Sequence, residues 1–174
     1  MFLLIFLCVM LALSLYLKAN NIVINYTASY PLGLYQKVTI DREIRAGDWV
    51  MFCLPGNPVT RLIAEREYLL HGRCQLGHAP LIKEVYAVAG DYVAVSAQGV
   101  SINHDPVINN TAPLRKDQQG RGLPIMASGR IEPGHYALFS DYDARSFDSR
   151  YFGAVNRDDI FTVIEPFWVL KGDP

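Results

Sequence analysis

The hydrophobic positions of this chain form one long apolar run, followed by short segments of mixed polarity. The run covers residues 2–17, carries no charge, and has Ser14 as its one clearly polar residue. At 1.5 Å per residue such a helix spans about 24 Å, somewhat less than the roughly 30 Å core of a bilayer. No basic side chain precedes the run and no clear small-x-small cleavage site follows it. This pattern favours an uncleaved membrane anchor over residues 1–18, with a cleaved signal peptide as the alternative.

One amphipathic helix is predicted after the anchor. Asn57 suits the N-cap, Pro58 suits the first helical position, and Gly72 suits the end of the helix. The apolar side chains between positions 59 and 70 fall largely on one stripe, as they do on a helix that packs against a core. We therefore expect a helix over residues 57–72.

The other apolar segments are short and rich in residues that favour strands. Turn residues separate them at Pro31–Gly33, Ala89–Asp91 and Gln98–Gly99, and the polar stretch 103–128 predicts a long surface excursion. The expected strands cover residues 22–26, 48–53, 84–88, 92–96, 100–102, 136–140 and 160–170. The pattern thus predicts a mostly β fold with one clear helix, built as a single domain over residues 19–174.

Composition narrows the possible partners. The formal net charge of −1 gives no electrostatic reason to expect a nucleic-acid partner. The cysteines and histidines lack zinc-ligand spacing, so neither a metal ion nor another cofactor is expected. Cys53 and Cys74 bracket a short segment and can pair in an oxidising compartment, although two unpaired core cysteines are the alternative.

Candidate chemistry begins with the serines, because a serine hydroxyl is a poor nucleophile until a base activates it. No serine lies in a Gly-x-Ser-x-Gly elbow, and none of the four histidines has a context that ties it to a serine. A histidine-based triad stays open as an alternative. Lys83 enters an apolar segment, where desolvation would lower the pKa of its amine. A lysine that merely reaches solvent from a strand edge is the ordinary interpretation.

Three blocks, in the same order, resemble the type I signal peptidase family. The first is Ser29 with Pro31. The second is Lys83, followed by Val85 and by the Gly-Asp pair at 90–91. The third covers residues 140–153 and contains the specific run Asp-Ser-Arg-Tyr-Phe-Gly. Together the blocks cover most of the chain beyond the apolar run.

A narrower resemblance, to the conjugative-transfer signal peptidases of the TraF group, is carried by residues 25–35 and by the cysteine-bracketed insert before the lysine. Members of that group mature pilin precursors, and some cyclise the pilin. Three positions depart from the general family pattern. Glu84 stands in place of an arginine, Ala89 in place of a proline, and Ser140 in place of the first glycine of the third block.

The resemblance implies a role for each matching residue. Ser29 would be the nucleophile and Lys83 its general base, with Asp148 completing the catalytic set. The supporting roles would be an oxyanion hole from the Thr27 hydroxyl and the Ser29 backbone N–H, a lysine-orienting hydroxyl on Ser146, and a structural ion pair between Asp148 and Arg150. The family fold is a mostly β, partly barrel-shaped domain, in agreement with the pattern of predicted strands.

The function implied by the resemblance is that of a membrane-bound serine endopeptidase that cleaves a pilin precursor after small residues. The catalytic domain would face the periplasm from the bacterial inner membrane, with lipid around the anchor, although Lys18 alone favours a cytoplasmic side. Three alternatives stay open: a general type I signal peptidase acting on proteins that carry signal peptides, a cytosolic self-cleaving Ser/Lys repressor, and a non-catalytic pilus-assembly module.

Overall fold

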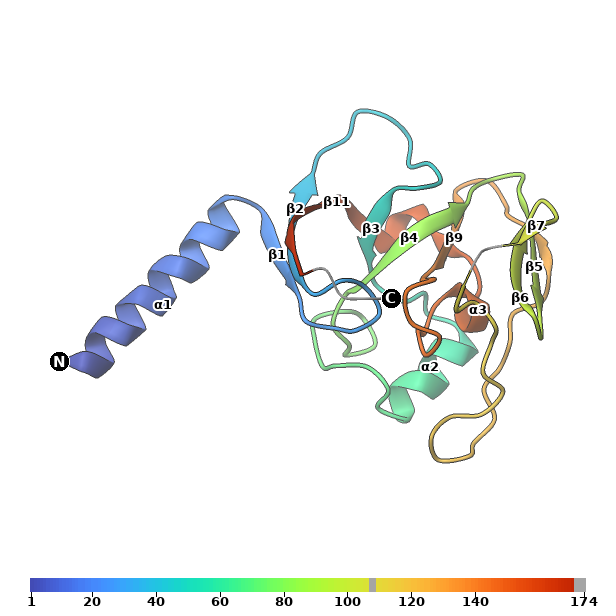
Figure 1. The fold of residues 1–174 in the computed structure, drawn as a ribbon, viewed down its shortest axis with the longest axis horizontal. Coiled ribbons are helices and arrows are strands. Elements are labelled where there is room, and N and C mark those ends of the chain that lie inside the picture. The colour runs from blue at the N-terminus through green and yellow to red at the C-terminus, as the bar shows by residue number, and fades with distance from the viewer. Residues whose placement is uncertain (107–108, 171–174) are drawn as a thin grey trace.

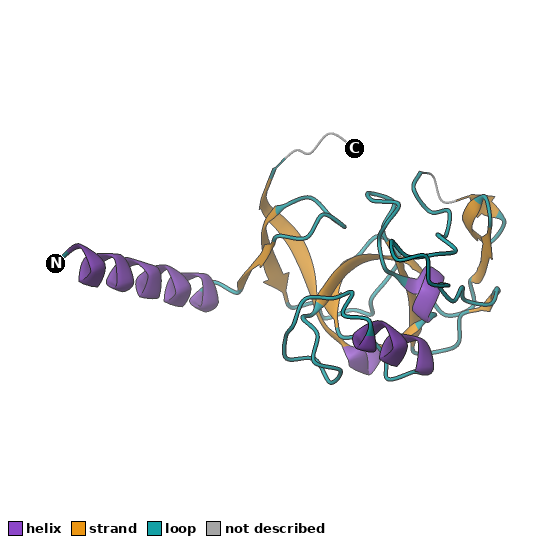
Figure 2. Ribbon diagram, turned by 90° about the horizontal axis from the view of Figure 1, so that it is seen from below, coloured by secondary structure: helices purple, strands orange, loops and turns teal. Residues whose placement is uncertain are grey.

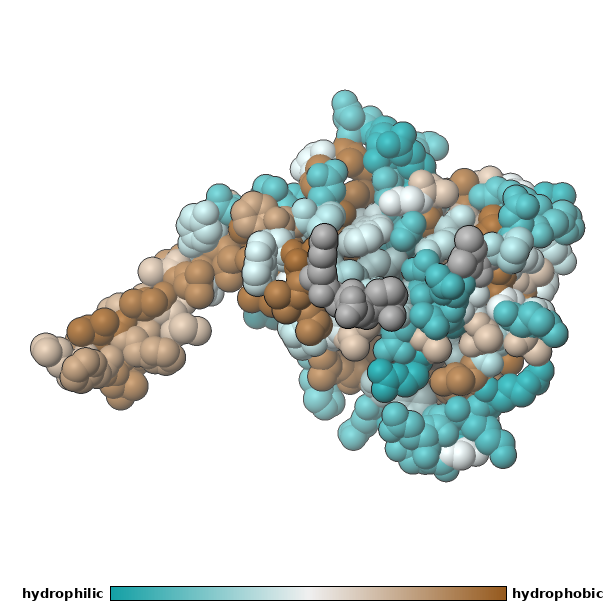
Figure 3. All heavy atoms as spheres, in the orientation of Figure 1, coloured by the Kyte–Doolittle hydropathy of each residue, from teal (hydrophilic) through white to brown (hydrophobic). Residues whose placement is uncertain are grey.

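The computed structural model describes residues 1–106 and 109–170. Helix α1 (Phe2–Ala19) projects from the rest of the chain, and none of its 18 residues is buried. Its mean hydropathy is 2.4, so by length and composition it can cross a membrane. Apolar side chains cover it along its whole length (Figure 3). A signal sequence near the N-terminus has the same properties, so α1 is a candidate span.

The larger sheet has seven strands in the order β1-β2-β11-β3-β4-β9-β10. Every neighbouring pair is antiparallel. The sheet curls into half a barrel (Figures 1 and 2), which confirms the predicted mostly β, partly barrel-shaped fold. Its strands are β1 (Ile22–Asn25), β2 (Gly33–Val38), β3 (Trp49–Phe52), β4 (Leu81–Ala87), β9 (His135–Phe139), β10 (Val155–Asn156) and β11 (Ile160–Val169).

A smaller sheet of four strands lies beside it, in the order β7-β6-β5-β8. These strands are β5 (Tyr92–Ser96), β6 (Gly99–Ile102), β7 (Asp105–Pro106) and β8 (Gly129–Arg130). Ser96 pairs with Gly99, so the hairpin turn lies at residues 97–98, one position before the predicted turn. Apart from residues 107–108, which lie outside the described chain, the predicted excursion over 103–128 is mostly loop.

The predicted helix over 57–72 is correct at its start and wrong at its end. Helix α2 (Pro58–Glu65) begins with a capping box between Asn57 and Thr60, as its sequence indicates. It stops early because Glu67 adopts a positive φ of 55° and Tyr68 donates a hydrogen bond to Asp117 in a distant loop. A long-range contact thus prevails over local helix propensity. The described chain also has two short helical turns, α3 (Ser149–Phe152) and η1 (Arg157–Asp159).

Strand β2 is not among the strands predicted from the sequence, because its first residue belongs to the predicted turn Pro31–Gly33. It lies between β1 and β11 and pairs with both, with Tyr35 wholly buried. Two neighbouring strands satisfy its backbone groups, and this tertiary support is invisible in a six-residue window. The connection between β1 and β2 is therefore short, spanning residues 26–32.

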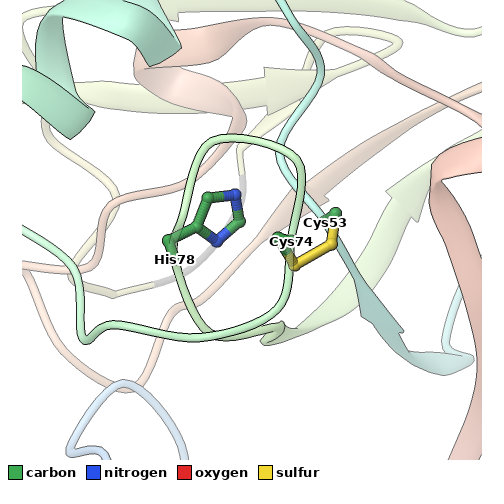
Figure 4. A group of neighbouring side chains, drawn as sticks. All are labelled: Cys53, Cys74 and His78. Carbon is green, nitrogen blue, oxygen red and sulfur yellow. A yellow bond between two sulfur atoms is a disulfide. The ribbon is translucent and has the colours of Figure 1, made fainter.

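A disulfide joins Cys53, directly after β3, to Cys74, beyond α2, which confirms the predicted pairing (Figure 4). His78 lies beside it, buried, with Nε2 accepting from the Leu54 N–H at 3.3 Å and Nδ1 donating to the Ala79 carbonyl at 2.7 Å. The two sulfurs and the imidazole are close enough to hold a metal ion. The sulfurs are bonded to each other, however, and so are not thiolate ligands.

Candidate active site

The β1–β2 connection carries Ser29, and the buried side chain of Asn25, at the end of β1, bonds to several of its carbonyls. The Asn25 amide Nδ2 donates to three carbonyls of the connection, those of Thr27 and Tyr30 at 3.2 Å and that of Pro31 at 3.1 Å. Asn25 is 5% exposed, so these bonds are shielded from water. The connection is therefore a defined loop, and it presents Ser29 at a fixed place.

Lys83 reaches this loop from the middle of β4, where its side chain is 2% exposed. Its Nζ lies 2.9 Å from the Ser29 Oγ, although the two residues are 54 positions apart in the chain. Burial lowers the pKa of the Lys83 amine to about 8, while attraction to Asp148 offsets part of that effect. The structure thus places a readily deprotonated amine against a serine hydroxyl, as the lysine-base hypothesis requires.

The carboxylate of Asp148 and the guanidinium of Arg150 form a fully buried ion pair close to this site. The two hydrogen bonds of the pair measure 2.7 Å at Arg150 Nε and 2.6 Å at the terminal nitrogen. Arg150 also donates to the carbonyls of Asn110 at 2.7 Å and Ser146 at 3.2 Å. Asp148 caps α3 by accepting from the Arg150 N–H. The pair is therefore satisfied on both sides and ties several segments together.

Two sequence-predicted groups lie in the site but make different contacts from those expected. The Ser146 side chain is 3% exposed, and within the described chain its hydroxyl has no hydrogen-bond partner. The Thr27 hydroxyl donates to Asn25 Oδ1 at 2.7 Å. Neither an amine-orienting bond from Ser146 nor a free Thr27 donor is present, so both roles stay predictions.

Glu84 and Ser140, which depart from the general family pattern, also contact the Ser29 loop. The sequence alone indicates no role for either residue. Glu84 lies half-buried in β4, and its Oε2 accepts from Tyr30 Oη at 3.1 Å and Trp49 Nε1 at 3.2 Å. Ser140 is fully buried, and its hydroxyl donates to the Ser29 carbonyl at 2.5 Å. Both residues therefore hold the loop that carries Ser29. The signal in the sequence for these two contacts was the departure of both residues from the general family pattern.

A cleft of about 330 Å³ opens over the serine and the lysine. An adjoining, mostly apolar hollow of about 260 Å³ shares part of its wall, including Leu70 and Ile82. None of the four histidines, all of which lie in the described chain, lines the cleft. A histidine-based triad with Ser29 therefore has no support in this arrangement. The cleft walls include Thr27, Ser29, Leu70, Lys83, Ser146 and Phe147.

The chain matches known proteins along most of its length. Residues 1–168 match the family model described as signal peptidase, peptidase S26. The chain is 40% identical to the plasmid transfer protein TraF of Escherichia coli, over 82% of this chain and 80% of that protein. It is 46% identical to a probable conjugal transfer protein TraF of Sinorhizobium fredii, over 76% of this chain and 69% of the other.

A solved structure of a signal peptidase I from Enterococcus faecalis is also similar. It has 19% identity and a TM-score of 0.42, and the likeness covers 70% of this chain and 97% of that one. Family and relatives define the class of protein: the chain belongs to the signal peptidase family S26. Within that family its relatives are TraF proteins, which confirms the resemblance that residues 25–35 and the cysteine-bracketed insert carry.

Proposed function

We propose that this chain is a membrane-anchored serine endopeptidase that cleaves a pilin precursor after small residues during maturation of a conjugative pilus. One observation carries the proposal: the Nζ of the buried Lys83 lies 2.9 Å from the Ser29 Oγ. A serine hydroxyl needs a base, and a desolvated amine with a lowered pKa supplies one near neutral pH. The names of the TraF relatives support the link to conjugation.

The first half of the reaction is acyl transfer to the enzyme. Neutral Lys83 takes the Ser29 hydroxyl proton as Oγ bonds to the scissile carbonyl carbon. The resulting oxyanion is held by the Ser29 N–H and by the Thr27 hydroxyl, which turns away from Asn25 to reach it. Lys83 then gives its proton to the leaving amine as the C–N bond breaks, which leaves an ester on Ser29.

The second half removes the acyl group. Water, or a free amine of the substrate itself, attacks the ester carbonyl and loses a proton to Lys83. The C–O bond to Ser29 breaks, and the proton returns to the serine oxygen. Attack by water yields a shortened pilin, whereas attack by the substrate's own amine yields a cyclic one.

The same proposal assigns the remaining parts of the chain. Residues 1–18 anchor the protein in the bacterial inner membrane, and residues 19–174 form the peptidase domain on the periplasmic side. The Cys53–Cys74 disulfide supports this side, because the periplasm is oxidising. The substrate lies extended in the cleft, with its small residues beside the narrow apolar hollow.

The test is co-expression of the chain with a candidate pilin precursor, followed by mass spectrometry of the products. Ser29→Ala and Lys83→Ala should each lower processing by at least about a thousandfold, because nucleophile and base act as one unit. Lys83→Arg should not restore it, since a guanidinium stays protonated. Lys37→Ala, at an exposed lysine of β2, is the matched control and should process normally. Normal processing by either Lys83 variant would refute the mechanism.

The substrate needs its own comparison. A secreted protein with an ordinary signal peptide, expressed in place of the pilin precursor, should stay uncleaved. Equal cleavage of both precursors would replace this proposal with a general signal peptidase. Failure to cut either one, together with normal binding of the pilin precursor, would favour a non-catalytic assembly module.

A further inference from the structure

Ser140, directly after β9, connects the buried ion pair with the backbone of Ser29. Its side chain is 0% exposed. Its N–H donates to Asp148 Oδ2 at 3.2 Å, and its carbonyl accepts from the Arg150 guanidinium at 3.4 Å. Its hydroxyl donates to the Ser29 carbonyl at 2.5 Å, across 111 positions of sequence. One residue thus contacts both charges of the pair and the residue that carries the nucleophile.

A second contact holds the Ser140 hydroxyl in this orientation. A carbonyl oxygen only accepts, so the single proton of the Ser140 hydroxyl points to Ser29. The Tyr142 N–H meanwhile donates to a lone pair of the Ser140 Oγ at 3.2 Å. The Ser140 backbone is in turn held by Asp148 and Arg150. The donor is therefore oriented before any substrate arrives.

We propose that Ser140 is a positioning residue that sets the direction of the Ser29 hydroxyl by holding the Ser29 carbonyl against the buried Asp148–Arg150 pair. The proposal rests on the assignment of Ser29 as nucleophile and Lys83 as base. Asn25 holds other carbonyls of the loop but does not bond to that of Ser29, which accepts from the Ser140 hydroxyl instead. The general family pattern has a glycine at this position, and a glycine lacks this donor. The restraint is thus one that the general family pattern does not supply.

The test compares two buried serines. Ser140→Ala removes the donor to Ser29, whereas Ser149→Ala removes a hydroxyl that is equally buried but accepts from the Leu138 N–H at 2.9 Å. Ser140→Ala should lower kcat for precursor cleavage by about 10- to 100-fold, the range for a misplaced reacting group, and leave KM within about twofold. Ser149→Ala should lower the melting temperature comparably and leave kcat unchanged. A Ser140→Ala loss of kcat no larger than that of Ser149→Ala overturns the proposal.

The pH dependence of kcat separates positioning from a change in charge. Ser140→Ala leaves Lys83 buried and adds or removes no charged group near it, so the acid limb should keep the apparent pKa of the unaltered protein. A limb shifted by a full pH unit would place the effect on the charges around Lys83 and overturn the positioning role.

One further variant covers a Ser140→Ala protein that fails to fold. If Ser140→Ala does not fold, Ser140→Cys keeps a side chain of similar size with a weaker donor. It should still lose several-fold in kcat, and unaltered kcat in a folded Ser140→Cys protein overturns the proposal. The parent assignment is tested apart from these variants, because full activity of Ser29→Ala or Lys83→Ala would remove the dyad whatever Ser140 does.

Discussion

Arg150 and Lys83 are two buried cations that lie near each other but have very different hydrogen-bond partners. Arg150 is 0% exposed and Lys83 is 2% exposed. Arg150 meets the carboxylate of Asp148 in two hydrogen bonds and also donates to backbone carbonyls. Lys83 donates, within the described chain, to the hydroxyl of Ser29 alone. One positive charge is thus paired and the other has a single neutral partner.

The consequence is a difference in pKa. Burial alone would lower the pKa of Arg150, but its hydrogen bonds to Asp148 raise the pKa above the usual range. Burial lowers the pKa of Lys83 to about 8, and the attraction of Asp148 does not undo that shift. A paired buried charge supports structure, whereas an unpaired one becomes neutral and reactive. Variants at Asp148, Lys83 and Ser146 test this difference between the two cations.

The largest expected effect on stability comes from breaking the paired charge. Asp148→Asn leaves the Arg150 guanidinium buried without its counter-charge, which should cost about 3–5 kcal/mol in the free energy of unfolding. Urea or guanidinium unfolding measures it. Asp143→Asn is the control, because Asp143 pairs with Arg145, whose side chain is 69% exposed. That change should cost less than about 1 kcal/mol. Equal losses in the two variants would show that the buried pair is not a structural element.

Removing the unpaired charge of Lys83 should raise the free energy of unfolding rather than lower it. The pKa of the Lys83 amine is about 8 in the folded protein, against an ordinary value of 10.5. Burial of the amine therefore costs no stability above pH 10.5, costs progressively more as the pH falls from 10.5 to 8, and costs its full amount below pH 8. Lys83→Met removes this penalty and should stabilise the fold at pH 7 by up to about 3 kcal/mol.

The gain from Lys83→Met should shrink between pH 8 and pH 10.5, because the unfolded amine loses its proton there as well. Unfolding free energies at several pH values across this window measure it. Lys37→Met, at an exposed position of β2, should show no such dependence on pH. A gain that does not change with pH would come from packing and would contradict the account of Lys83 as a desolvated amine.

The smallest effect is expected at Ser146, whose buried hydroxyl has no partner in the described chain. Ser146→Ala removes no hydrogen bond, so the free energy of unfolding should change by less than about 1 kcal/mol. If the hydroxyl turns to the Lys83 amine once substrate binds, kcat should still fall by about tenfold. Thermal melts and steady-state kinetics measure the two quantities. A marked loss of stability with unchanged kcat would make Ser146 a packing residue.

The sequence alone predicted the architecture where the pattern was local. The start of α2 follows from Asn57 and Pro58, and β5 has the predicted bounds 92–96 because a short alternating run sits between clear turns. The end of α2 and the whole of β2 depend on partners far away in the chain. The hydrogen bond of Tyr68 to Asp117 and the pairing of β2 with β11 leave no local trace.

The candidate site likewise combines features that follow from local sequence with features that depend on long-range contacts. Ser29 and Lys83 were chosen because of residues next to them in the sequence, and the fold brings them together. The apolar neighbours of Lys83 indicate some desolvation, but its nearly complete burial depends on the place of β4 between β3 and β9, which a strand prediction does not contain. The contacts of Asn25 and Ser140 could not be predicted either, because each requires the folded path of the β1–β2 loop.

The central claim is that the unpaired amine of Lys83 loses its proton near neutral pH. The most direct measurement is an NMR titration of lysine side chains carrying a carbon-13 label next to the amine. Lys83→Arg assigns the signal, because it removes that resonance alone. The account predicts a titration midpoint near 8 for Lys83. A midpoint near 10.5, the value for an unperturbed lysine, would contradict it.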